Sequence, residues 1–363
     1  MQVPHLRLVD SHDESETTAL SWKELFEQAA QSPHGLRALV DMRARLLGTL
    51  PDHPGWAVVE ADVAAQLRSI LVPESLELRR ISEDTAPEIL DQIVRYEAVH
   101  KMADRRELVR RLQRDRRCFA LFHPAMPDEP IIFTELALTG EMSARVQPIL
   151  DAGSPVIDPA SCTCAMFYSI SSCHDGLRGI PFGNLLIRRV VDHLRAEFPE
   201  LRTFATVSPV PGFREWLTSK AHDSGDADLQ ALVGQLETLA WADEASAAST
   251  LTAPILSLAA AYLTQAKRGK EPADAVARFH LGNGARLERI NWIGDTSTAG
   301  VTRSFGLTAN YVYSLSDIDE NQQAYIDARA IVVSDAVRLR ALDAFGFGQK
   351  STSTFIAPSI LSL

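Results

Sequence analysis

One stretch of the sequence, residues 166–209, constrains the fold of this chain more than any other. An apolar run leads into a turn that holds Gly179 and Gly183, and a second apolar run follows at 201–209. Between the runs, residues 183–198 carry apolar side chains at helical spacing. A strand, a glycine turn, an amphipathic helix and another strand in this order indicate a βαβ-like unit.

Further patterns extend this unit into a larger fold. Strand-like runs lie at 118–124, 130–139, 287–295 and 309–316. Helical spacing predicts helices at 20–31, 35–50, 62–72, 86–102, 105–113 and 324–346. The sequence therefore predicts an α+β, or mixed α/β, chain. Its helical N-terminal bundle spans residues 1–76, and its second domain spans 77–363 with a helical insertion at about 218–275.

Charge and composition exclude several classes of function. The formal net charge of the 363 residues is −11, so no broad nucleic-acid surface is expected. No apolar run approaches the ~20 residues of a membrane span, and the first residues lack a signal-peptide pattern. We therefore expect a cytoplasmic protein with no membrane partner.

The four cysteines give no evidence for a disulfide framework or a metal site. In a cytoplasmic protein they are expected to be reduced thiols. His174 follows the last of them, but the spacing is not that of paired zinc ligands. No metal is therefore predicted. The cysteines are Cys118, Cys162, Cys164 and Cys173.

The glycine turn has two interpretations. Glycines let a ligand approach the backbone, and the start of the following helix offers unpaired N–H groups and a partial positive charge. Together with Arg178, these features suit a phosphate or pyrophosphate. The alternative is a plain strand-to-helix turn. The turn is neither a Walker A loop nor a dinucleotide-binding fingerprint, but it resembles the pyrophosphate loop of GNAT-type acyltransferases, which bind coenzyme A.

Longer segments resemble the malonyl-CoA decarboxylase family over nearly the whole chain. They include 167–217 and 278–315, with SPVPGF, HLGNGA, RINW and GLTANY in order. EAVH (97–100), RRCF (116–119), ALT (137–139) and part of the helical bundle fit the same family. The resemblance implies a helical oligomerisation domain followed by a GNAT-like catalytic domain. It implies conversion of malonyl-CoA to acetyl-CoA and carbon dioxide, a place in fatty acid metabolism, and no cofactor besides the substrate's own coenzyme A.

The resemblance also assigns residues. The catalytic pair corresponds to Ser208 and His280, and the acyl-CoA loop corresponds to Arg178, Gly179, Ile180, Pro181, Phe182, Gly183 and Asn184. Pro181 stands where some relatives have an acidic residue, so a hydrogen-bonding role at that position is in doubt. The chain ends in Leu-Ser-Leu rather than the peroxisomal Ser-Lys-Leu, which favours a bacterial-type cytoplasmic enzyme.

This chemistry suits the assigned residues. The thioester carbonyl can accept the electrons left by carbon dioxide, so the site must hold the carboxylate, stabilise an enolate and protonate the α-carbon. A serine positions the carboxylate or exchanges a proton with it, and a histidine can donate as an imidazolium at neutral pH. Additional contacts are expected from Ser169, Asn283, Asn291, Tyr311 and Tyr313.

Two other functions remain open. The first is an acyltransferase that uses the same coenzyme A site, and the second is an acyl-CoA-binding protein without catalysis. In every case the short helical bundle buries little surface alone, which favours a homo-oligomer, a dimer or a tetramer, formed through that bundle.

Overall fold

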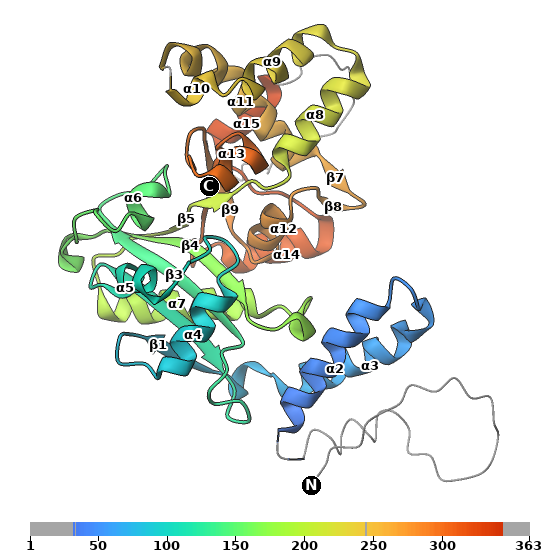
Figure 1. Ribbon diagram of the computed structural model, residues 1–363, viewed down its shortest axis with the longest axis vertical. Coiled ribbons are helices and arrows are strands. Elements are labelled where there is room, and N and C mark those ends of the chain that lie inside the picture. The colour runs from blue at the N-terminus through green and yellow to red at the C-terminus, as the bar shows by residue number, and fades with distance from the viewer. Residues whose placement is uncertain (1–31, 33, 244, 344–363) are drawn as a thin grey trace, which may run out of the picture. The chain divides into compact units, whose positions relative to one another are not determined.

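The computed structural model describes residues 32, 34–243 and 245–343, and these form two compact units (Figure 1). The first unit contains the described residues up to Ser75 together with His174–Ile180. The second contains Leu76–Cys173 and the described residues from Pro181 onward. A segment from the middle of the chain therefore groups with the first unit. The helix expected at 20–31 lies outside the described residues.

The first unit is a helix pair that holds a short turn. Helix α2 (Gly35–Thr49) and helix α3 (Ala57–Ile70) confirm the helices predicted there, with the 3₁₀ turns η1 (Pro54–Trp56) and η2 (Pro73–Ser75) beside α3. Arg43 of α2 pairs with Glu60 of α3 at 2.8 Å. Its Nη1 atom also donates to the carbonyls of Gly176 at 2.7 Å and Arg178 at 2.8 Å. The buried arginine therefore ties the turn η4 (Asp175–Leu177) to the helix pair.

Replacing Gly176 with alanine should destabilise the first unit. A Cβ atom at this position would lie 1.9 Å from the carbonyl oxygen of Val40, which is backbone and cannot move aside cheaply. We expect the free energy of unfolding to fall by about 2 kcal/mol or more, as overpacking does elsewhere. Gly48, also on α2, has nothing within 4 Å of such a Cβ atom. Gly48→Ala should instead stabilise by roughly 0.5–1 kcal/mol. Urea unfolding of both variants tests the contrast, and an unchanged midpoint for Gly176→Ala would contradict it.

The second unit is built on an eight-stranded mixed sheet. Its main path has the order β1-β2-β3-β4-β5-β10-β6, and β9 pairs with β10. Only β4 and β5 are parallel, and helix α7 (Phe182–Glu197) connects them. This arrangement confirms the βαβ unit and the mixed α/β class. The strands are β1 (Glu77–Ile81), β2 (Arg116–Phe122), β3 (Ile132–Thr139), β4 (Cys164–Ser172), β5 (Thr203–Thr206), β6 (Ser208–Pro209), β9 (Arg286–Asn291) and β10 (Thr308–Val312).

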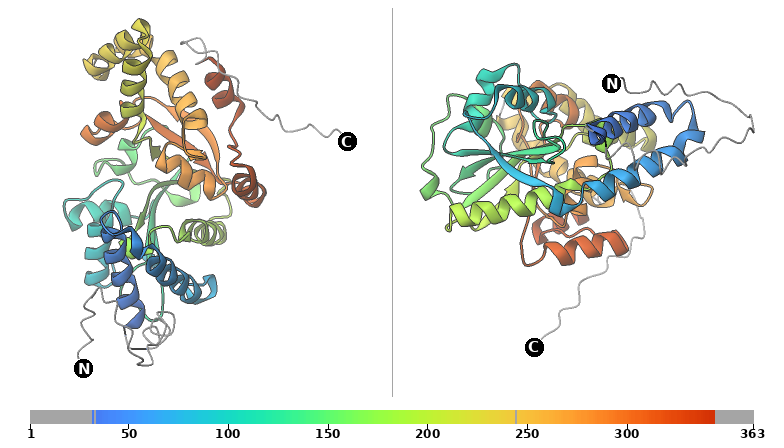
Figure 2. Two further views of the ribbon diagram at one scale, coloured as in Figure 1. Left: turned by 90° about the vertical axis from the view of Figure 1, so that its right-hand side faces the viewer. Right: turned by 90° about the horizontal axis from the view of Figure 1, so that it is seen from below.

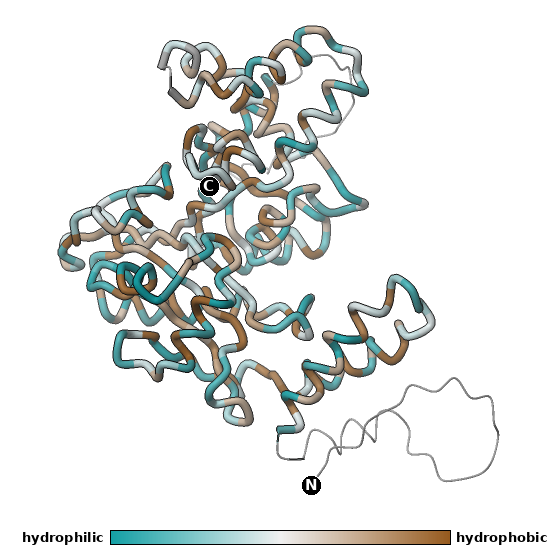
Figure 3. Tube along the Cα trace, in the orientation of Figure 1, coloured by the Kyte–Doolittle hydropathy of each residue, from teal (hydrophilic) through white to brown (hydrophobic). Residues whose placement is uncertain are grey.

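Helices cover both faces of the first strands (Figure 2). Side chains alternate between the faces of a strand. Cys118 and Phe122 of β2 therefore share a face, where they form a core cluster with Ile93 of α4 (Pro87–Tyr96) and Leu108 of α5 (Arg105–Leu112). Phe119 faces the other way and packs against the ring of His193 on α7, with 5.0 Å between the two ring centroids. Strands β2 and β3 are buried along almost their whole length, and their apolar residues appear brown in Figure 3.

The predicted insertion is mainly helical and begins earlier than expected. Helices α8 (Phe213–Ser224), α9 (Ala227–Glu237), α10 (Ala240–Asp243) and α11 (Ala245–Gln265) are followed by a hairpin of β7 (Lys267–Arg268) and β8 (Glu271–Pro272) and by α12 (Ala275–Gly282). The short helices α6 (Gln147–Leu150) and α13 (Thr298–Ser304) and the turn η3 (Pro159–Ser161) lie in connections elsewhere. No described helix is long and apolar enough to cross a membrane.

Three expectations about the elements were wrong. The helix expected at 324–346 is interrupted: α14 (Ile318–Ala328) and α15 (Asp335–Asp343) flank a segment in which Val333 bridges to Leu287 of β9. The strand expected at 201–209 is broken at Val207 into β5 and β6. The helix expected at 86–102 ends at Tyr96. The Glu97 carboxylate there accepts hydrogen bonds from the backbone N–H groups of Val99 and His100, which takes the place of further helical bonds.

Candidate active site

A small cavity of about 170 Å³ contains both residues assigned to the catalytic pair. One wall comes from strand β4, a second from the β5–β6 segment, and a third from α12, while Val99 closes another side. No lysine or arginine is among the residues that line it. The lining residues are Val99, Phe167, Tyr168, Ser169, Ile170, Thr206, Ser208, Pro209, Ala275, Val276, Phe279 and His280.

Ser208 and His280 are in direct contact. The Ser208 Oγ atom lies 2.9 Å from His280 Nε2, although 72 positions separate the residues in the chain. Ser208 begins β6, and His280 lies in the last turn of α12. Asp274 caps the start of α12, because its carboxylate accepts hydrogen bonds from the backbone N–H groups of Val276 and Ala277. This cap fixes where the helix begins. Both members of the pair are buried.

A chain of hydrogen bonds fixes the orientation of the histidine ring. The Tyr313 hydroxyl lies 2.8 Å from His280 Nδ1, its sole hydrogen-bond contact among the described residues. A buried hydroxyl proton needs an acceptor, so Tyr313 donates to Nδ1 and the ring proton sits on Nε2. Nε2 then donates to Ser208 Oγ, and Ser208 donates to Thr206 Oγ1 at 2.8 Å. This arrangement gives the protons of Tyr313, His280 and Ser208 an acceptor each, and Thr206 Oγ1 also accepts from the backbone N–H of Tyr311.

The histidine ring is neutral. Burial lowers the pKa of His280 to about 3, because no charged group offsets the loss of solvent. The ring also stacks on Tyr311, with centroids 4.6 Å apart, and its other neighbours are neutral. The expectation of an imidazolium at neutral pH is therefore wrong for the free protein.

A bulge in β4 shapes the wall opposite the histidine. Ser169 pairs with Glu135 of β3, but Phe167 pairs with Leu136, so Tyr168 is an extra residue in the ladder. The Ser169 hydroxyl donates to the Glu97 carboxylate at 2.5 Å, and its oxygen lies 3.3 Å from the Ser171 hydroxyl, so Ser169 is engaged within the wall of the cavity. The bulge places backbone polar groups of β4 beside the catalytic pair.

The residues of the glycine turn are divided between the two units. Arg178, Gly179 and Ile180 belong to the first unit, where Arg178 is exposed and pairs with Asp175. Gly179 has a φ of +79°, which favours glycine. The remaining residues, Pro181 to Asn184, belong to the second unit.

The start of α7 lies against the helix that carries the histidine. Pro181 occupies the N-cap position and no side chain caps the helix, so its first backbone N–H groups have no side-chain acceptor. A Cβ atom at Gly183 would lie 2.6 Å from the Phe279 ring. Phe279 also lines the small cavity. The Asn184 amide is already bound to Gln322 and Arg188, so it is engaged within the protein.

The other candidates separate into two groups. Tyr311 and Tyr313 contact His280, and Ser169 lines the small cavity. Asn283 ends α12 beside Gly183, and Asn291 donates to Thr308 and Asn310 within the sheet. Neither asparagine lines the small cavity.

Sequence reasoning missed several residues of this site. Thr206 lies two positions before Ser208, so strand alternation could have placed both side chains on one face. Phe279 and Val99 are apolar, and their types gave no signal of a site. Glu97 lies within a recognised motif, but its burial beneath the cavity wall depends on tertiary packing.

Two family models match the chain. One, described as the malonyl-CoA decarboxylase C-terminal domain, matches residues 75–349, and the other, described as the malonyl-CoA decarboxylase N-terminal domain, matches residues 15–71. Among curated proteins, the mitochondrial malonyl-CoA decarboxylase of Anser anser anser is 33% identical over 344 residues, covering 87% of this chain and 68% of that protein. The mitochondrial malonyl-CoA decarboxylase of Rattus norvegicus is 32% identical, covering 87% of this chain and 70% of that protein.

Solved structures agree with these matches. The crystal structure of malonyl-CoA decarboxylase from Rhodopseudomonas palustris superimposes with a TM-score of 0.82 at 42% identity, covering 88% of this chain and 79% of that one. The structure of the protein of that name from Agrobacterium vitis has the same TM-score and coverage at 40% identity.

Proposed function

The chain belongs to the malonyl-CoA decarboxylase family, and from that premise we propose that it converts malonyl-CoA to acetyl-CoA and carbon dioxide in the small cavity. The observation that carries the residue assignment is the 2.9 Å contact between Ser208 and His280 within this uncharged enclosure. It is an enzyme of the carboxy-lyase class. Ser208 positions the malonyl carboxylate, and His280 protonates the α-carbon.

The first step is loss of the carboxylate. The Ser208 hydroxyl and the His280 Nε2–H group donate to the carboxylate oxygens and hold the bond to be broken in line with the carbonyl π system. The cavity wall has no lysine or arginine to stabilise the carboxylate charge. When the C–C bond breaks, its electron pair moves into the thioester carbonyl, and the carboxylate leaves as neutral carbon dioxide.

In the second step the enolate is stabilised and then protonated. Backbone N–H groups at the Tyr168 bulge are suitable donors to the enolate oxygen, since fixed donors need no reorganisation. The α-carbon then takes the proton from His280 Nε2, and the imidazolate left behind regains a proton from solvent after the products leave. A neutral imidazole can serve, because the enolate carbon is the stronger base, and neutral histidines act as donors in other enzymes. Tyr313 acts as a positioning residue by keeping the ring proton on Nε2.

The acyl-CoA loop completes the proposed binding site. The uncapped start of α7, with Gly183 in its first turn, suits the pyrophosphate of coenzyme A. Pro181 offers no hydrogen-bonding side chain, so backbone groups carry this interaction. Arg178 and Asn184 are weaker candidates, because Asp175, Gln322 and Arg188 already occupy their side chains.

A direct assay tests the reaction. Purified full-length protein should convert malonyl-CoA to acetyl-CoA, with an equal amount of carbon dioxide, when both products are followed by mass. The rival acyltransferase function predicts product only when an amine acceptor is added. Binding of malonyl-CoA without turnover would instead support the non-catalytic alternative and reject the proposed reaction.

The pH dependence should distinguish a neutral from a charged histidine. The folded-state pKa of His280 is lowered to about 3, so its ring stays neutral from about pH 4 upward. If the neutral ring is the donor, kcat/KM should show no step attributable to this residue between pH 5.5 and 8. If the imidazolium were required, kcat/KM would fall about tenfold for each pH unit across that window. A profile of malonyl-CoA turnover at constant ionic strength decides between the two.

Assembly and location remain predictions. The helix pair of the first unit exposes Val58 and other apolar atoms, which suits contact with a second copy. A homo-oligomer predicts a mass of at least twice 39.9 kDa by light scattering, and a monomer at working concentration would reject it. We also propose a cytoplasmic location, by analogy with the bacterial relatives.

A further inference from the structure

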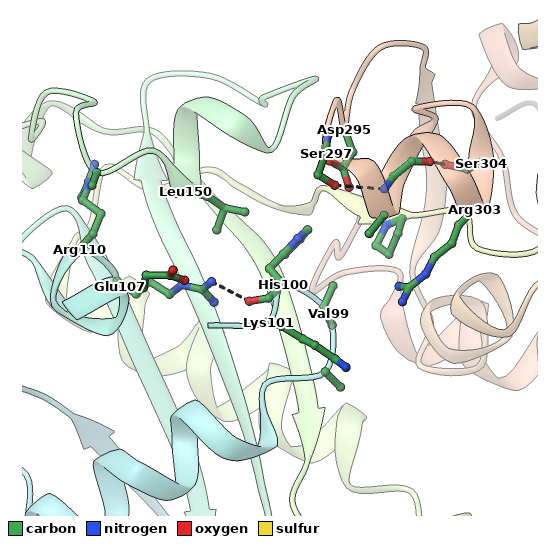
Figure 4. Close-up of a pocket in the computed structure, with 16 residues that line it drawn as sticks. Val99, His100, Lys101, Glu107, Arg110, Leu150, Asp295, Ser297, Arg303 and Ser304 are labelled. Atoms are coloured by element: carbon green, nitrogen blue, oxygen red, sulfur yellow. Dashed lines mark hydrogen bonds between the residues drawn. The ribbon is translucent and has the colours of Figure 1, made fainter. Parts of the chain in front are cut away.

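The segment 98–101 lines a second, larger cavity (Figure 4), and one of its residues also closes the small cavity. The larger cavity has a volume of about 490 Å³, and it shares Val99 and Pro209 with the small one. The rest of its wall comes mainly from helix α5, the end of α6 and the segment 295–304. The placement of Val99 therefore sets one side of the space in which the proposed reaction takes place.

Strand β4 loses its partner strand where it reaches the small cavity. Its parallel pairing with β5 ends at Phe167 and Thr206, and Val207 N still donates to the Phe167 carbonyl at 3.0 Å. The next residues of β4, 168–170, all line the small cavity, and the bulge at Tyr168 lies among them. Because β5 does not hold the backbone at the bulge, its position depends on other contacts.

One buried carboxylate joins these two walls of the small cavity. Glu97 Oε1 accepts hydrogen bonds from the backbone N–H groups of Val99 at 2.8 Å and His100 at 2.7 Å. Glu97 Oε2 accepts from the Ser169 hydroxyl at 2.5 Å. One oxygen is therefore occupied by the segment that carries Val99, and the other is occupied by the bulged part of β4.

Neighbouring hydrogen bonds support the same arrangement. The Ser171 hydroxyl accepts from Ala98 N at 3.2 Å, which is a second connection between the segment and β4. Thr134 Oγ1 donates to the Ser169 carbonyl at 2.8 Å. Since the side chain and the carbonyl of Ser169 are both held, a change at Glu97 reaches the backbone of the bulge through Ser169.

Packing alone does not explain a carboxylate at this position. Glu97 is 3% exposed and forms no ion pair among the described residues, because Arg111 pairs with Glu135 at 2.6 Å instead. Burial raises the pKa of Glu97, while its hydrogen-bond donors and the nearby Arg111 act in the opposite direction. A neutral side chain of similar size would avoid the cost of burying a charge. The geometry of the contacts, rather than the filling of space, therefore accounts for a glutamate here.

We propose that Glu97 is a positioning residue for the decarboxylation, which holds the bulge of β4 where its backbone N–H groups meet the enolate oxygen. This inference rests on the proposed function, because the bulge matters to the rate only if an enolate forms beside it. Glu97 does not line the small cavity, so it acts through Ser169 and does not touch the substrate.

Glu97→Gln tests this role with little change of shape. The amide oxygen can still accept from Val99 and His100, so the end of α4 should be preserved. The amide nitrogen has to donate to Ser169, which reverses that hydrogen bond and replaces a charge-assisted bond by a weaker neutral one. We expect kcat to fall about tenfold while KM for malonyl-CoA and the thermal midpoint stay close to wild type. An unchanged kcat, or a kcat that falls only together with thermal stability, would overturn the proposal.

A double-mutant cycle tests whether Glu97 acts through Ser169. Ser169→Ala removes the same hydrogen bond from the other side, so it should lower kcat to a similar extent. The variant that carries both substitutions should be no slower than the slower single variant, because the two residues act as one unit. Losses that multiply in the double variant would show that Glu97 acts by another route, against the proposal.

Glu135→Gln is the matched control, since Glu135 is a buried glutamate in the same part of the fold. Burial and the nearby Glu97 raise the pKa of Glu135 to about 8, so an amide resembles the form that prevails at pH 7. Its side chain pairs with Arg111 rather than with Ser169, and it lines neither cavity. The control should keep kcat within about twofold of wild type. A loss equal to that of Glu97→Gln would remove the specific role of Glu97.

Infrared spectroscopy of bound acetyl-CoA tests the position of the donors without turnover. Acetyl-CoA labelled with ¹³C at the thioester carbonyl should absorb at a lower frequency on the wild-type protein than on Glu97→Gln, because well-placed N–H donors polarise the carbonyl. Glu135→Gln should give the wild-type band. The same band on wild type and Glu97→Gln would contradict the proposed positioning, whatever the kinetics show.

These measurements separate the role of Glu97 from the proposed function. A wild-type protein that binds acetyl-CoA but releases no carbon dioxide from malonyl-CoA would refute the proposed function, and the infrared bands would still decide whether Glu97 positions the carbonyl site. Equal turnover by wild type and Glu97→Gln would instead leave the proposed function standing and refute the role of Glu97.

Discussion

Replacement of His280 by asparagine should lower the rate of malonyl-CoA decarboxylation by about 10²–10⁴-fold, the usual contribution of a positioned proton donor. The amide group cannot deliver a proton to the α-carbon, and it cannot reproduce the contacts of Nε2 with Ser208 and of Nδ1 with Tyr313. We expect kcat to fall while acetyl-CoA binding changes little, because the coenzyme A moiety does not depend on the ring. Steady-state kinetics and acetyl-CoA titration measure the two quantities.

The control for this variant is another histidine-to-asparagine change. His222 lies exposed on α8, where its ring contacts Asp223. His222→Asn should keep wild-type kinetics and thermal stability. If His280→Asn retained kcat within about threefold of wild type, the ring could not be the proton donor. If kcat and thermal stability fell together, the loss would reflect packing rather than chemistry.

Replacement of Ser208 by alanine should lower kcat by roughly 10²–10³-fold, comparable to removing a fixed donor from an oxyanion site. The change removes the group proposed to hold the malonyl carboxylate and leaves the Nε2–H group of His280 without its acceptor. It also removes the donor to Thr206. The expected signature is a large loss for malonyl-CoA with acetyl-CoA affinity intact, because acetyl-CoA carries no carboxylate.

Ser257→Ala provides the matched control for Ser208→Ala. Ser257 is buried on α11 and lines neither cavity. Its loss should leave turnover unchanged. Equal effects of the two substitutions, or a wild-type rate for Ser208→Ala, would remove Ser208 from the mechanism.

Local patterns in the sequence predicted much of the fold. The helices at α2, α5 and α7 have strong apolar periodicity, and the strands at β2, β3 and β4 are apolar runs bounded by turns. The failures occurred where tertiary contacts override propensity. The segment after Tyr96 has a helical pattern, but the Glu97 side chain ends the helix there. The pairing of Val333 with Leu287 interrupts the last predicted helix in the same way.

The site was predictable in its residue types but not in its electrostatics. Resemblance to the family pointed to Ser208 and His280, and the structure brings them together. The charge state of His280 depends on burial by Tyr311, Phe279 and the β4 wall, which no local pattern reveals. Tyr313 was among the expected contacts, but its hydrogen bond to His280 Nδ1 depends on tertiary packing.

The long chain separation between Ser208 and His280 has a consequence for the order of folding. The contact closes a loop that contains helices α8 to α11 and the β7–β8 hairpin. Contacts that close long loops bear their entropic cost before they gain packing, so they tend to form late. Strands β1 to β5, whose pairings all close shorter loops, can therefore assemble before the catalytic pair exists. During refolding, activity should return after most of the secondary structure has formed, so enzymatic turnover would report completion of the insertion rather than collapse of the chain.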